Sequence, residues 1–388
     1  MVDIPVHLPM SWNFFMAMGK PWGAPWRVAE ENGGMNIVFM TSSRTKSGGS
    51  RQALYLARAL VRRGHDLTFL APENSTLPSL AGDLPWEYLP RNKHKWKNVV
   101  RATLARKLPV VWHVFHNKAV KKAAWWGLLW RRKPLVVLAQ RGVVFPPNNF
   151  LPYVSPGIDC FVANSEACAR VLARRGVSKK RLAVVYNAVP QYRITPLKTA
   201  DQVREELGLG KDSFLLGAVG YNNPNKGMDK LIEAFAIANA PGRLVLVGPD
   251  EARFGPMAEA MGVRDRVVFT GETESVADYL QILDAFALPS LSESMPNTLM
   301  EAIFLGLPVI ATRTGGVPEL VEGNGLLVAP GDVPGLAGGI RELALNVEQR
   351  SAWAEQSRVL ARKFSIDAKA ERMETLYSDL LGRKGVAP

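Results

Sequence analysis

The chain has 388 residues, of which 47% are hydrophobic and 21% charged, so composition excludes a largely disordered protein and length favours two domains. Lys and Arg number 48 against 35 Asp and Glu, which gives a formal net charge of +13. The two cysteines, Cys160 and Cys168, are too few for a disulfide framework and lack metal-ligand spacing. We therefore expect a reducing, cytoplasmic location, and no apolar run reaches the roughly 18 residues of a membrane span.

Regular structure is expected to begin at Met35. Residues 1–34 contain three tryptophans and few charges, and they lack the basic start, apolar middle and cleavage site of a signal peptide. They are interpreted as a poorly ordered N-terminal extension.

From Met35 onward, short β-branched runs alternate with amphipathic helices, a pattern typical of parallel strands joined by crossover helices. A helix is predicted over 51–63, capped by Ser50 and ended by Gly64. Another is predicted over 117–130. The strands predicted in this half are 36–40, 66–71, 110–115, 135–139, 160–165 and 182–187.

The same architecture restarts after a polar stretch. Its predicted strands are 214–220, 243–248, 266–271, 284–290, 307–312 and 325–329, and a helix is predicted from Met228. The expected fold is α/β, with two Rossmann-like doubly wound domains facing a cleft at the carboxyl ends of their strands. The predicted boundaries are 35–190 for the first domain, 191–212 for a linker, 213–364 for the second domain and 365–388 for a helix crossing back to the first.

The strongest motif lies within residues 288–321. Glu293 and Glu301 have seven residues between them and bracket a turn and a helix predicted to start near Asn297. The N–H groups and the positive dipole end of such a helix suit a diphosphate. Glu293 is then suited to accept hydrogen bonds from sugar hydroxyls and Glu301 from a ribose. The alternative is that both are ordinary exposed acids flanking a helix.

This segment resembles the E-x7-E motif of the retaining glycosyltransferase family 4, which has the two-domain GT-B fold. The run GLPVIATRTGGVPELV, residues 306–321, matches the segment that follows the motif in that family, and the resemblance extends over 36–381. It implies a nucleotide-sugar donor, retention of anomeric configuration and a catalytic role for Glu293. The donor-binding residues that it implies are Gly48, Gly49, Ser294, Met295, Asn297, Thr298 and Glu301.

Lys226, followed by Gly227, resembles the strand–loop–KG segment of the family, in which the lysine meets the donor phosphates. An ammonium suits the charge that develops on a departing nucleoside diphosphate, so Lys226 is the second catalytic candidate. The alternative is a solvated lysine before a helix. Tyr221 departs from the family, which usually has arginine directly after the strand glycine.

Three further candidates come from the first half. Gly48 and Gly49 join a strand to a helix and match the loop that faces the donor diphosphate in the family, although a simple tight turn gives the same pattern. His116 and Arg141 are the acceptor-side candidates, and Arg141 could also compensate for Tyr221. No D-x-D motif is present, so we expect no metal and no cofactor, the nucleotide sugar being a co-substrate.

A basic segment over residues 91–133 contains thirteen Lys and Arg residues, no acidic residue and five of the ten tryptophans. Its predicted helix places Lys118, Lys122, Trp125 and Leu129 on one stripe. Docking on an anionic membrane surface is the first interpretation. A solvated basic face with the tryptophans packed on the sheet is the second, and nucleic-acid binding, for which no recognised module is present, is the third.

The sequence therefore predicts a metal-independent glycosyltransferase acting on a glycan or lipid-linked envelope acceptor, with the lipopolysaccharide type favoured. We expect it in the cytoplasm, peripheral on the inner face of the membrane, and not bound to nucleic acid. The alternatives are a nucleotide-sugar epimerase or hydrolase of the same fold, and a non-catalytic sugar-nucleotide-binding relative.

Overall fold

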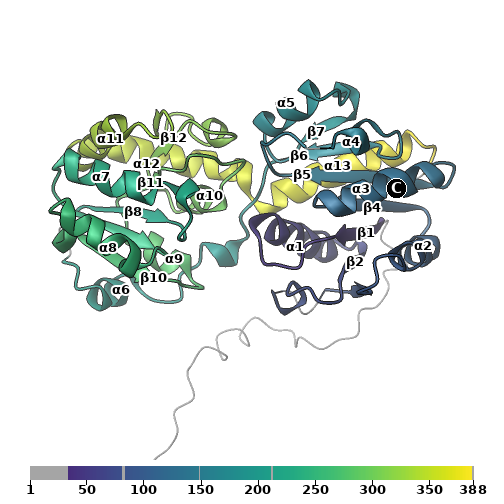
Figure 1. Cartoon of the computed structure of the whole chain (residues 1–388), viewed down its shortest axis with the longest axis horizontal. Coiled ribbons are helices and arrows are strands. Elements are labelled where there is room, and N and C mark those ends of the chain that lie inside the picture. The colour runs from purple at the N-terminus through teal and green to yellow at the C-terminus, as the bar shows by residue number, and fades with distance from the viewer. Residues whose placement is uncertain (1–33, 81–83, 148, 211–212, 387–388) are drawn as a thin grey trace, which may run out of the picture.

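The computed structural model describes residues 34–80, 84–147, 149–210 and 213–386. The extension predicted over 1–34 therefore lies, apart from Gly34, outside the described residues. Two separate sheets, every strand pair of which is parallel, form two α/β units (Figure 1). The predicted pair of Rossmann-like domains is confirmed.

The first sheet has seven strands in the order β3-β2-β1-β4-β5-β6-β7. Its strands are β1 (Asn36–Thr41), β2 (Asp66–Pro72), β3 (Trp86–Leu89), β4 (Val110–Phe115), β5 (Leu135–Arg141), β6 (Cys160–Ala163) and β7 (Leu182–Val184). Its helices are α1 (Gly48–Arg62), α2 (Trp96–Arg106), α3 (Asn117–Leu129), α4 (Leu151–Val154) and α5 (Glu166–Arg174), with short 3₁₀ turns η2 (Pro78–Leu80) and η3 (Lys179–Arg181).

The second sheet has six strands in the order β10-β9-β8-β11-β12-β13. Its strands are β8 (Leu215–Val219), β9 (Arg243–Val247), β10 (Val267–Gly271), β11 (Ala285–Leu288), β12 (Val309–Thr312) and β13 (Gly325–Val328). Its helices are α6 (Ala200–Glu206), α7 (Met228–Ala238), α8 (Glu251–Ala260), α9 (Val276–Leu280), α10 (Asn297–Phe304), α11 (Val333–Leu345) and α12 (Val347–Ala361), with 3₁₀ turns η5 (Pro224–Lys226), η6 (Arg264–Arg266), η7 (Val317–Glu319) and η8 (Arg362–Phe364).

The start of α1 differs from the sequence prediction. Ser47, not Ser50, is the N-cap, and its hydroxyl accepts a hydrogen bond from the Ser50 N–H. The helix begins at Gly48 because the glycine pair is wound into its first turn rather than left in the preceding loop. The two glycines therefore present the helix N-terminus itself.

Two elements inside and beside the basic segment were not predicted. The edge strand β3 has only four residues, too few to show a period, and the polar side chains of the helix α2 weaken its hydrophobic periodicity. Trp96, Val100 and Leu104 of α2 are nevertheless buried against the sheet.

The stretch 191–212, expected to be a linker, holds the turn η4 (Gln191–Arg193) and the helix α6. A capping box between Thr199 and Gln202 starts α6, and Val203 and Leu209 enter the core of the second domain. The helix therefore packs with the second domain.

The chain passes between the domains at two adjacent points. Val189 and Ser365 form a parallel bridge there, and the Val189 N–H donates to the Phe364 carbonyl at 3.0 Å. After the second crossing, α13 (Ile366–Gly382) returns along the first domain (yellow in Figure 1). It packs on α1 and buries Met373 and Tyr377 in the core of the first domain.

An ion-pair cluster fastens α13 to α1. Glu374 accepts two hydrogen bonds from the Arg63 guanidinium at 2.7 and 2.8 Å, and its Oε1 lies 2.7 Å from His65 Nε2. Within the described part of the chain, no helix combines the length and the apolar character needed to cross a membrane.

Candidate active site

The turn after β11 brings together the two predicted catalytic side chains. Lys226 Nζ, at the end of η5, donates to Glu293 Oε1 at 2.7 Å, and the Ser290 hydroxyl donates to the same oxygen at 2.9 Å. The side chains of Lys226 and Glu293 are only 19% and 13% exposed. This geometry fits neither a solvated lysine nor an ordinary exposed acid.

Two glycines hold this turn in shape. Gly315 has φ +52°, and a Cβ atom there would lie 1.7 Å from the Glu293 carbonyl oxygen. Gly227 has φ +65°, and a Cβ atom there would lie 2.2 Å from the Pro289 carbonyl oxygen. Because only glycine tolerates both the left-handed conformation and these approaches, the loops after β12 and η5 close directly on the segment that carries Glu293.

The helix α10 begins at Asn297, as the sequence predicts. Its N-cap residue is Pro296, which provides no side-chain hydrogen bond to the first turn. The Asn297 side-chain oxygen instead accepts from Gln52 Nε2 at 3.1 Å and from Asn187 Nδ2 at 3.3 Å. Thr298 follows within the same first turn and is half-buried.

The first domain meets this helix start at the glycine pair. A Cβ atom on Gly48 would lie 3.4 Å from Asn297 Nδ2, so the N-termini of α1 and α10 face each other across the domain boundary. The Ser294 hydroxyl donates to Asn164 Oδ1 at 2.8 Å, and the Met295 carbonyl accepts from Asn187 Nδ2 at 3.0 Å. The predicted donor-binding residues Gly48, Ser294, Met295 and Asn297 thus lie along one seam.

A carboxylate that sequence reasoning missed completes this seam. Glu319, in η7, accepts hydrogen bonds from the backbone N–H groups of Glu166 and Ala167 at 2.7 and 3.0 Å. Glu319 thereby provides hydrogen-bond acceptors for backbone N–H groups at the start of α5, which belongs to the other domain. The sequence did offer one hint of a role for Glu319, because this residue lies within 306–321, the run that resembles family 4 glycosyltransferases.

His116 lies beside the glycine pair rather than apart from it. A Cβ atom on Gly49 would lie 3.5 Å from His116 Nε2, and His116 Nδ1 lies 2.8 Å from the Thr41 hydroxyl. The residue has a positive φ of 71° and precedes α3. Burial lowers the pKa of His116, against a smaller effect of its hydrogen bond to the Phe115 backbone, so the imidazole is neutral at pH 7.

Arg141 has a different environment from the one predicted. It is 4% exposed, and its Nη1 donates at 2.8 Å both to Asn117 Oδ1 and to the Tyr153 hydroxyl. Its Nη2 donates to the Phe145 carbonyl. The guanidinium therefore ties α3, α4 and the loop after β5 together, and it is not a free cation that replaces the missing arginine at Tyr221.

Tyr221 is 56% exposed, and the Lys226 ammonium lies 5.6 Å from the centroid of its ring. Such a cation–π contact holds a lysine without neutralising its charge. The tyrosine therefore helps to position Lys226 at this site.

Glu301 is buried in α10, with 2% of the residue exposed. Arg193 Nε donates to its Oε1 at 2.9 Å, whereas Oε2 has no hydrogen-bond partner among the described residues. Burial raises the pKa of Glu301, and Arg193 opposes that shift. Sequence reasoning missed Arg193, since one basic residue in a polar stretch gives no signal.

Among the residues that the structure describes, no three His, Cys, Asp or Glu side chains gather in a way that could hold a metal ion. Metal independence stays a prediction.

Comparison with known proteins places these residues in a family. Residues 199–360 match the model for glycosyl transferases group 1, and residues 46–192 match the model for glycosyltransferase family 4. Together the two models span most of both domains.

Two curated relatives and one solved structure illustrate the match. The chain is 28% identical to N-acetyl-alpha-D-glucosaminyl L-malate synthase of Bacillus anthracis, over 60% of this chain and 63% of that one. It is 30% identical to the lipopolysaccharide core biosynthesis glycosyltransferase LpsE of Rhizobium meliloti, over 58% of this chain and 65% of that one. These matches thus span less than two thirds of each relative's length.

The crystal structure of Anabaena Alr3699/HepE in complex with UDP superimposes with a TM-score of 0.78 at 22% identity, covering 89% of this chain and all of that one. That likeness shows the fold. On the family matches, the chain belongs to the group 1 glycosyltransferases of family 4, with the GT-B fold.

Proposed function

We propose that this chain is a retaining, metal-independent glycosyltransferase that moves a sugar from a nucleotide-sugar donor to a glycan or lipid-linked envelope acceptor. The lipopolysaccharide type is favoured, in keeping with the relative LpsE. The observation that carries the proposal is the Lys226–Glu293 pair beside the start of α10, opposite the glycine pair of the first domain.

In the proposed mechanism the second domain binds most of the donor. The nucleotide lies between the Val247–Gly248 turn and Glu301, whose unpartnered Oε2 accepts a hydrogen bond from the ribose. The diphosphate lies against the N-termini of α1 and α10, where backbone N–H groups and the helix dipoles favour negative charge. Glu293 accepts hydrogen bonds from the hydroxyls of the transferred sugar.

The bond from the anomeric carbon to the diphosphate oxygen breaks, and the bond to the acceptor oxygen forms on the same face of the sugar. Lys226 stabilises the negative charge that the leaving diphosphate acquires. Because Arg141 is committed to other partners, Lys226 and the two helix N-termini carry this stabilisation. The acceptor approaches from the first domain, and its hydroxyl proton leaves with the diphosphate.

The basic segment, residues 91–133, supports a membrane-bound acceptor, but not through all the side chains that the sequence indicated. Trp96 and Trp112 are buried, and the Lys122 ammonium lies 5.3 and 5.0 Å from the ring centroids of Trp96 and Trp126. Most of these tryptophans thus pack inward, as the second sequence interpretation holds. Lys122 is part of that packing and not of an open stripe.

An exposed apolar surface nevertheless remains on α3 and α4, and we call it the α3–α4 patch. Trp125 and Leu129 are 63% and 66% exposed. The patch consists of Trp125, Leu128, Leu129, Phe150, Leu151 and Val154. Exposed Lys118, Lys121, Arg131 and Arg132 lie on α3 or directly after it. Apolar side chains beside lysine and arginine suit the headgroup region of an anionic bilayer, so we assign this patch to membrane docking.

Ligand-dependent thermal stability tests the donor assignment. A panel of nucleoside diphosphates and nucleotide sugars is added with and without EDTA to the wild type, to Glu301→Ala and to the exposed control Glu355→Ala. A ligand at 100 times its Kd stabilises by about 2.7 kcal/mol. We expect an EDTA-insensitive shift with one nucleotide, lost only in Glu301→Ala. No shift with any nucleotide contradicts the proposal.

Product analysis separates the remaining alternatives. An epimerase or hydrolase turns the donor over without an acceptor, and a non-catalytic relative binds the nucleotide without releasing it from the sugar. We expect turnover only when an acceptor is present.

Vesicle flotation tests the membrane assignment. Leu129→Glu and Trp125→Glu should each weaken binding to vesicles containing anionic lipid, while Val359→Glu, at a 54% exposed apolar position on α12, should not. Equal binding by neutral vesicles, or salt-sensitive binding to duplex DNA instead, contradicts membrane docking.

A further inference from the structure

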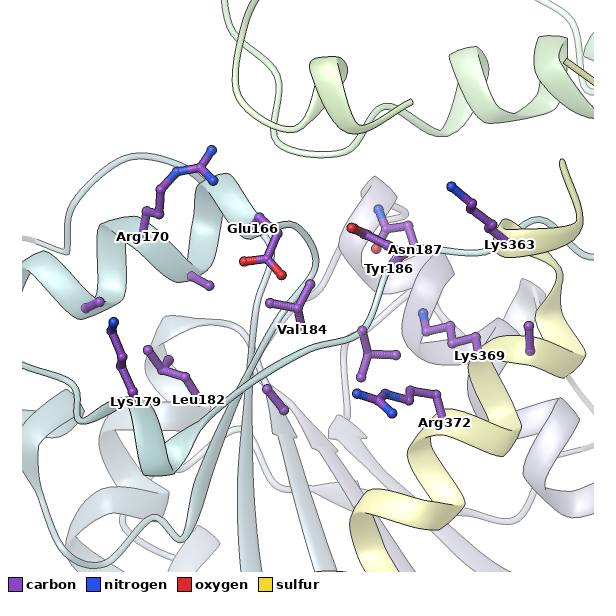
Figure 2. A pocket seen from close by; sticks show the side chains of 15 residues that line it. Glu166, Arg170, Lys179, Leu182, Val184, Tyr186, Asn187, Lys363, Lys369 and Arg372 are labelled. Atoms are coloured by element: carbon purple, nitrogen blue, oxygen red, sulfur yellow. The ribbon is translucent and has the colours of Figure 1, made fainter. Parts of the chain in front are cut away.

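An open cavity of about 980 Å³ lies at the outer edge of β7, next to the point where the chain crosses between domains. Residues of α5 line one side, residues of α13 line the other, and β7 forms the floor (Figure 2). The predicted active-site residues are not among its lining residues. The cavity therefore contains neither Glu293 nor Lys226, but two of its lining residues, Glu166 and Asn187, bond to residues of the seam.

The lining is strongly basic. Five cationic side chains face a single carboxylate, that of Glu166; they are Arg170, Lys179, Lys363, Lys369 and Arg372. Lys363 is paired with Glu322 at 2.9 Å. None of the other four forms an ion pair with any residue that the structure describes.

Lys369 is the most unusual of these residues because it is only 6% exposed. Its Nζ donates to Gln52 Oε1 at 2.8 Å, which is its one hydrogen bond within the described part of the chain. Burial lowers its pKa to about 7. Burying a charged amine without a carboxylate partner costs free energy. An anion that binds beside the amine offsets this cost and favours the charged form.

The position of the side chains completes the argument. Lys369 and Arg372 extend from α13 in the same direction, toward β7, and the Asn187 amide lies above them (Figure 2). An ammonium and a guanidinium from one helix, with an amide on the facing segment, are groups of the kind that recognise phosphate oxygens in proteins. We propose that this hinge cavity, defined by Lys369, Arg372 and Asn187, binds a small phosphate-bearing anion.

The hinge cavity is connected to the candidate active site through two side chains. Gln52, which holds Lys369, donates to the Asn297 side chain at 3.1 Å and to the Ala188 carbonyl at 2.7 Å. Asn187 lines the cavity and also donates to Asn297 at 3.3 Å. An anion that draws on Lys369 and Asn187 therefore changes the contacts of the first residue of α10. This coupling, unlike the anion site, rests on the proposed function.

Calorimetric titration with inorganic phosphate tests the site, with the protein in a phosphate-free buffer. Arg372→Gln replaces an exposed residue, and Lys369→Met keeps the length of the buried chain. Each should lower the phosphate affinity by about tenfold or more. Arg174→Gln removes the same charge from α5 outside the cavity and should leave the affinity within about twofold of the wild type.

Lys226→Gln distinguishes the hinge cavity from the active site and should also leave this phosphate affinity unchanged. Phosphate binding that is lost in Lys226→Gln but kept in Arg372→Gln and Lys369→Met would overturn the proposal, as would no detectable binding by the wild type.

A second titration with UDP tests the coupling. Saturating phosphate should change the UDP affinity of the wild type by at least about fivefold, and that of Arg372→Gln by less than about twofold. If phosphate leaves the UDP affinity of the wild type unchanged, the proposed coupling is wrong, whereas the proposed phosphate site in the hinge cavity stands. Phosphate binding that depends on Arg372, in a protein that binds no nucleotide, refutes the proposed function and likewise leaves the site standing.

Discussion

Lys226 Nζ and Glu293 Oε1 are joined by a 2.7 Å hydrogen bond between segments that lie 67 residues apart. The pair is shielded from solvent, and the cation is held next to the place proposed for the departing diphosphate. Without a donor bound, the Glu293 carboxylate is the hydrogen-bond partner of Lys226, and phosphate oxygens would replace it when the donor binds. The two side chains should therefore behave as one unit rather than as independent groups.

The first prediction concerns this unit. Lys226→Gln and Glu293→Gln should each lower kcat by about 10²- to 10³-fold, because each removes an interaction that stabilises the transition state. The double variant should lose much less than the product of the two. Steady-state rates measure this, and Lys230→Gln, which breaks the half-exposed pair with Glu233, is the matched control. A loss below about fivefold in Lys226→Gln contradicts the assignment.

The second prediction concerns Arg193, which positions Glu301. In Arg193→Gln the buried carboxylate loses its cation, so the protein should be destabilised by about 3 kcal/mol at neutral pH. The destabilisation should shrink as the pH falls, because Glu301 can then take up a proton. Nucleotide affinity should fall about tenfold, with partial recovery in Arg193→Lys.

Urea unfolding at two pH values and nucleotide titration measure both effects of Arg193→Gln. Arg362→Gln, at an exposed position, is the control. A destabilisation that is the same at every pH would show that Glu301 does not respond to Arg193.

The third prediction isolates the close approach at Gly315. Gly315→Ala should destabilise the protein by about 3 kcal/mol or abolish nucleotide binding, because its Cβ would lie 1.7 Å from the Glu293 carbonyl. Gly331 also has a positive φ, of 79°, but nothing lies within 4 Å of a Cβ built there. Gly331→Ala should therefore cost only about 1 kcal/mol. Equal melting temperatures for the two variants would contradict the steric explanation.

The fourth prediction follows from the pKa of Lys369, which burial lowers from 10.5 to about 7. Between these values the unfolded chain binds a proton that the folded protein does not, so this group makes stability rise with pH across that window. Below pH 7 the full cost of burying the ammonium is present.

Lys369→Met removes that cost. In phosphate-free buffer the variant should be more stable than the wild type by a few kcal/mol near about pH 6, with a smaller difference near about pH 9. Thermal unfolding at both pH values gives the comparison. A difference that grows with pH has the wrong sign and would mean that Lys369 is buried as a charged group.

Local sequence patterns predict much of the fold. The buried strands are continuous apolar runs, and the start of α10 at Asn297 follows from the motif that surrounds it. The edge strand β3 was missed because four residues are too few to show a period, and the helix α2 because exposed polar side chains dilute its hydrophobic periodicity. Ser50 was mistaken for the N-cap because the sequence does not show that Gly48 and Gly49 are helical.

The partners of the candidate site were harder to predict. Arg141 lies at the end of a strand, where a cleft residue is expected. Its guanidinium instead donates to Asn117, Tyr153 and the Phe145 carbonyl, and these contacts depend on tertiary packing. The same holds for Arg193 on Glu301 and for Glu319 at the start of α5, which join segments more than 100 residues apart. No local pattern encodes such pairs.

The path of α13 has a consequence for the order in which the protein is made. Tyr377 bonds to His113 of β4, a residue 264 positions earlier in the chain, and its ring is fully buried in the core of the first domain. During synthesis every strand of the second sheet leaves the ribosome before this tyrosine does. The first domain therefore lacks these core residues until the end of synthesis, and we expect its nascent form to leave the apolar surface beneath α13 uncovered until then.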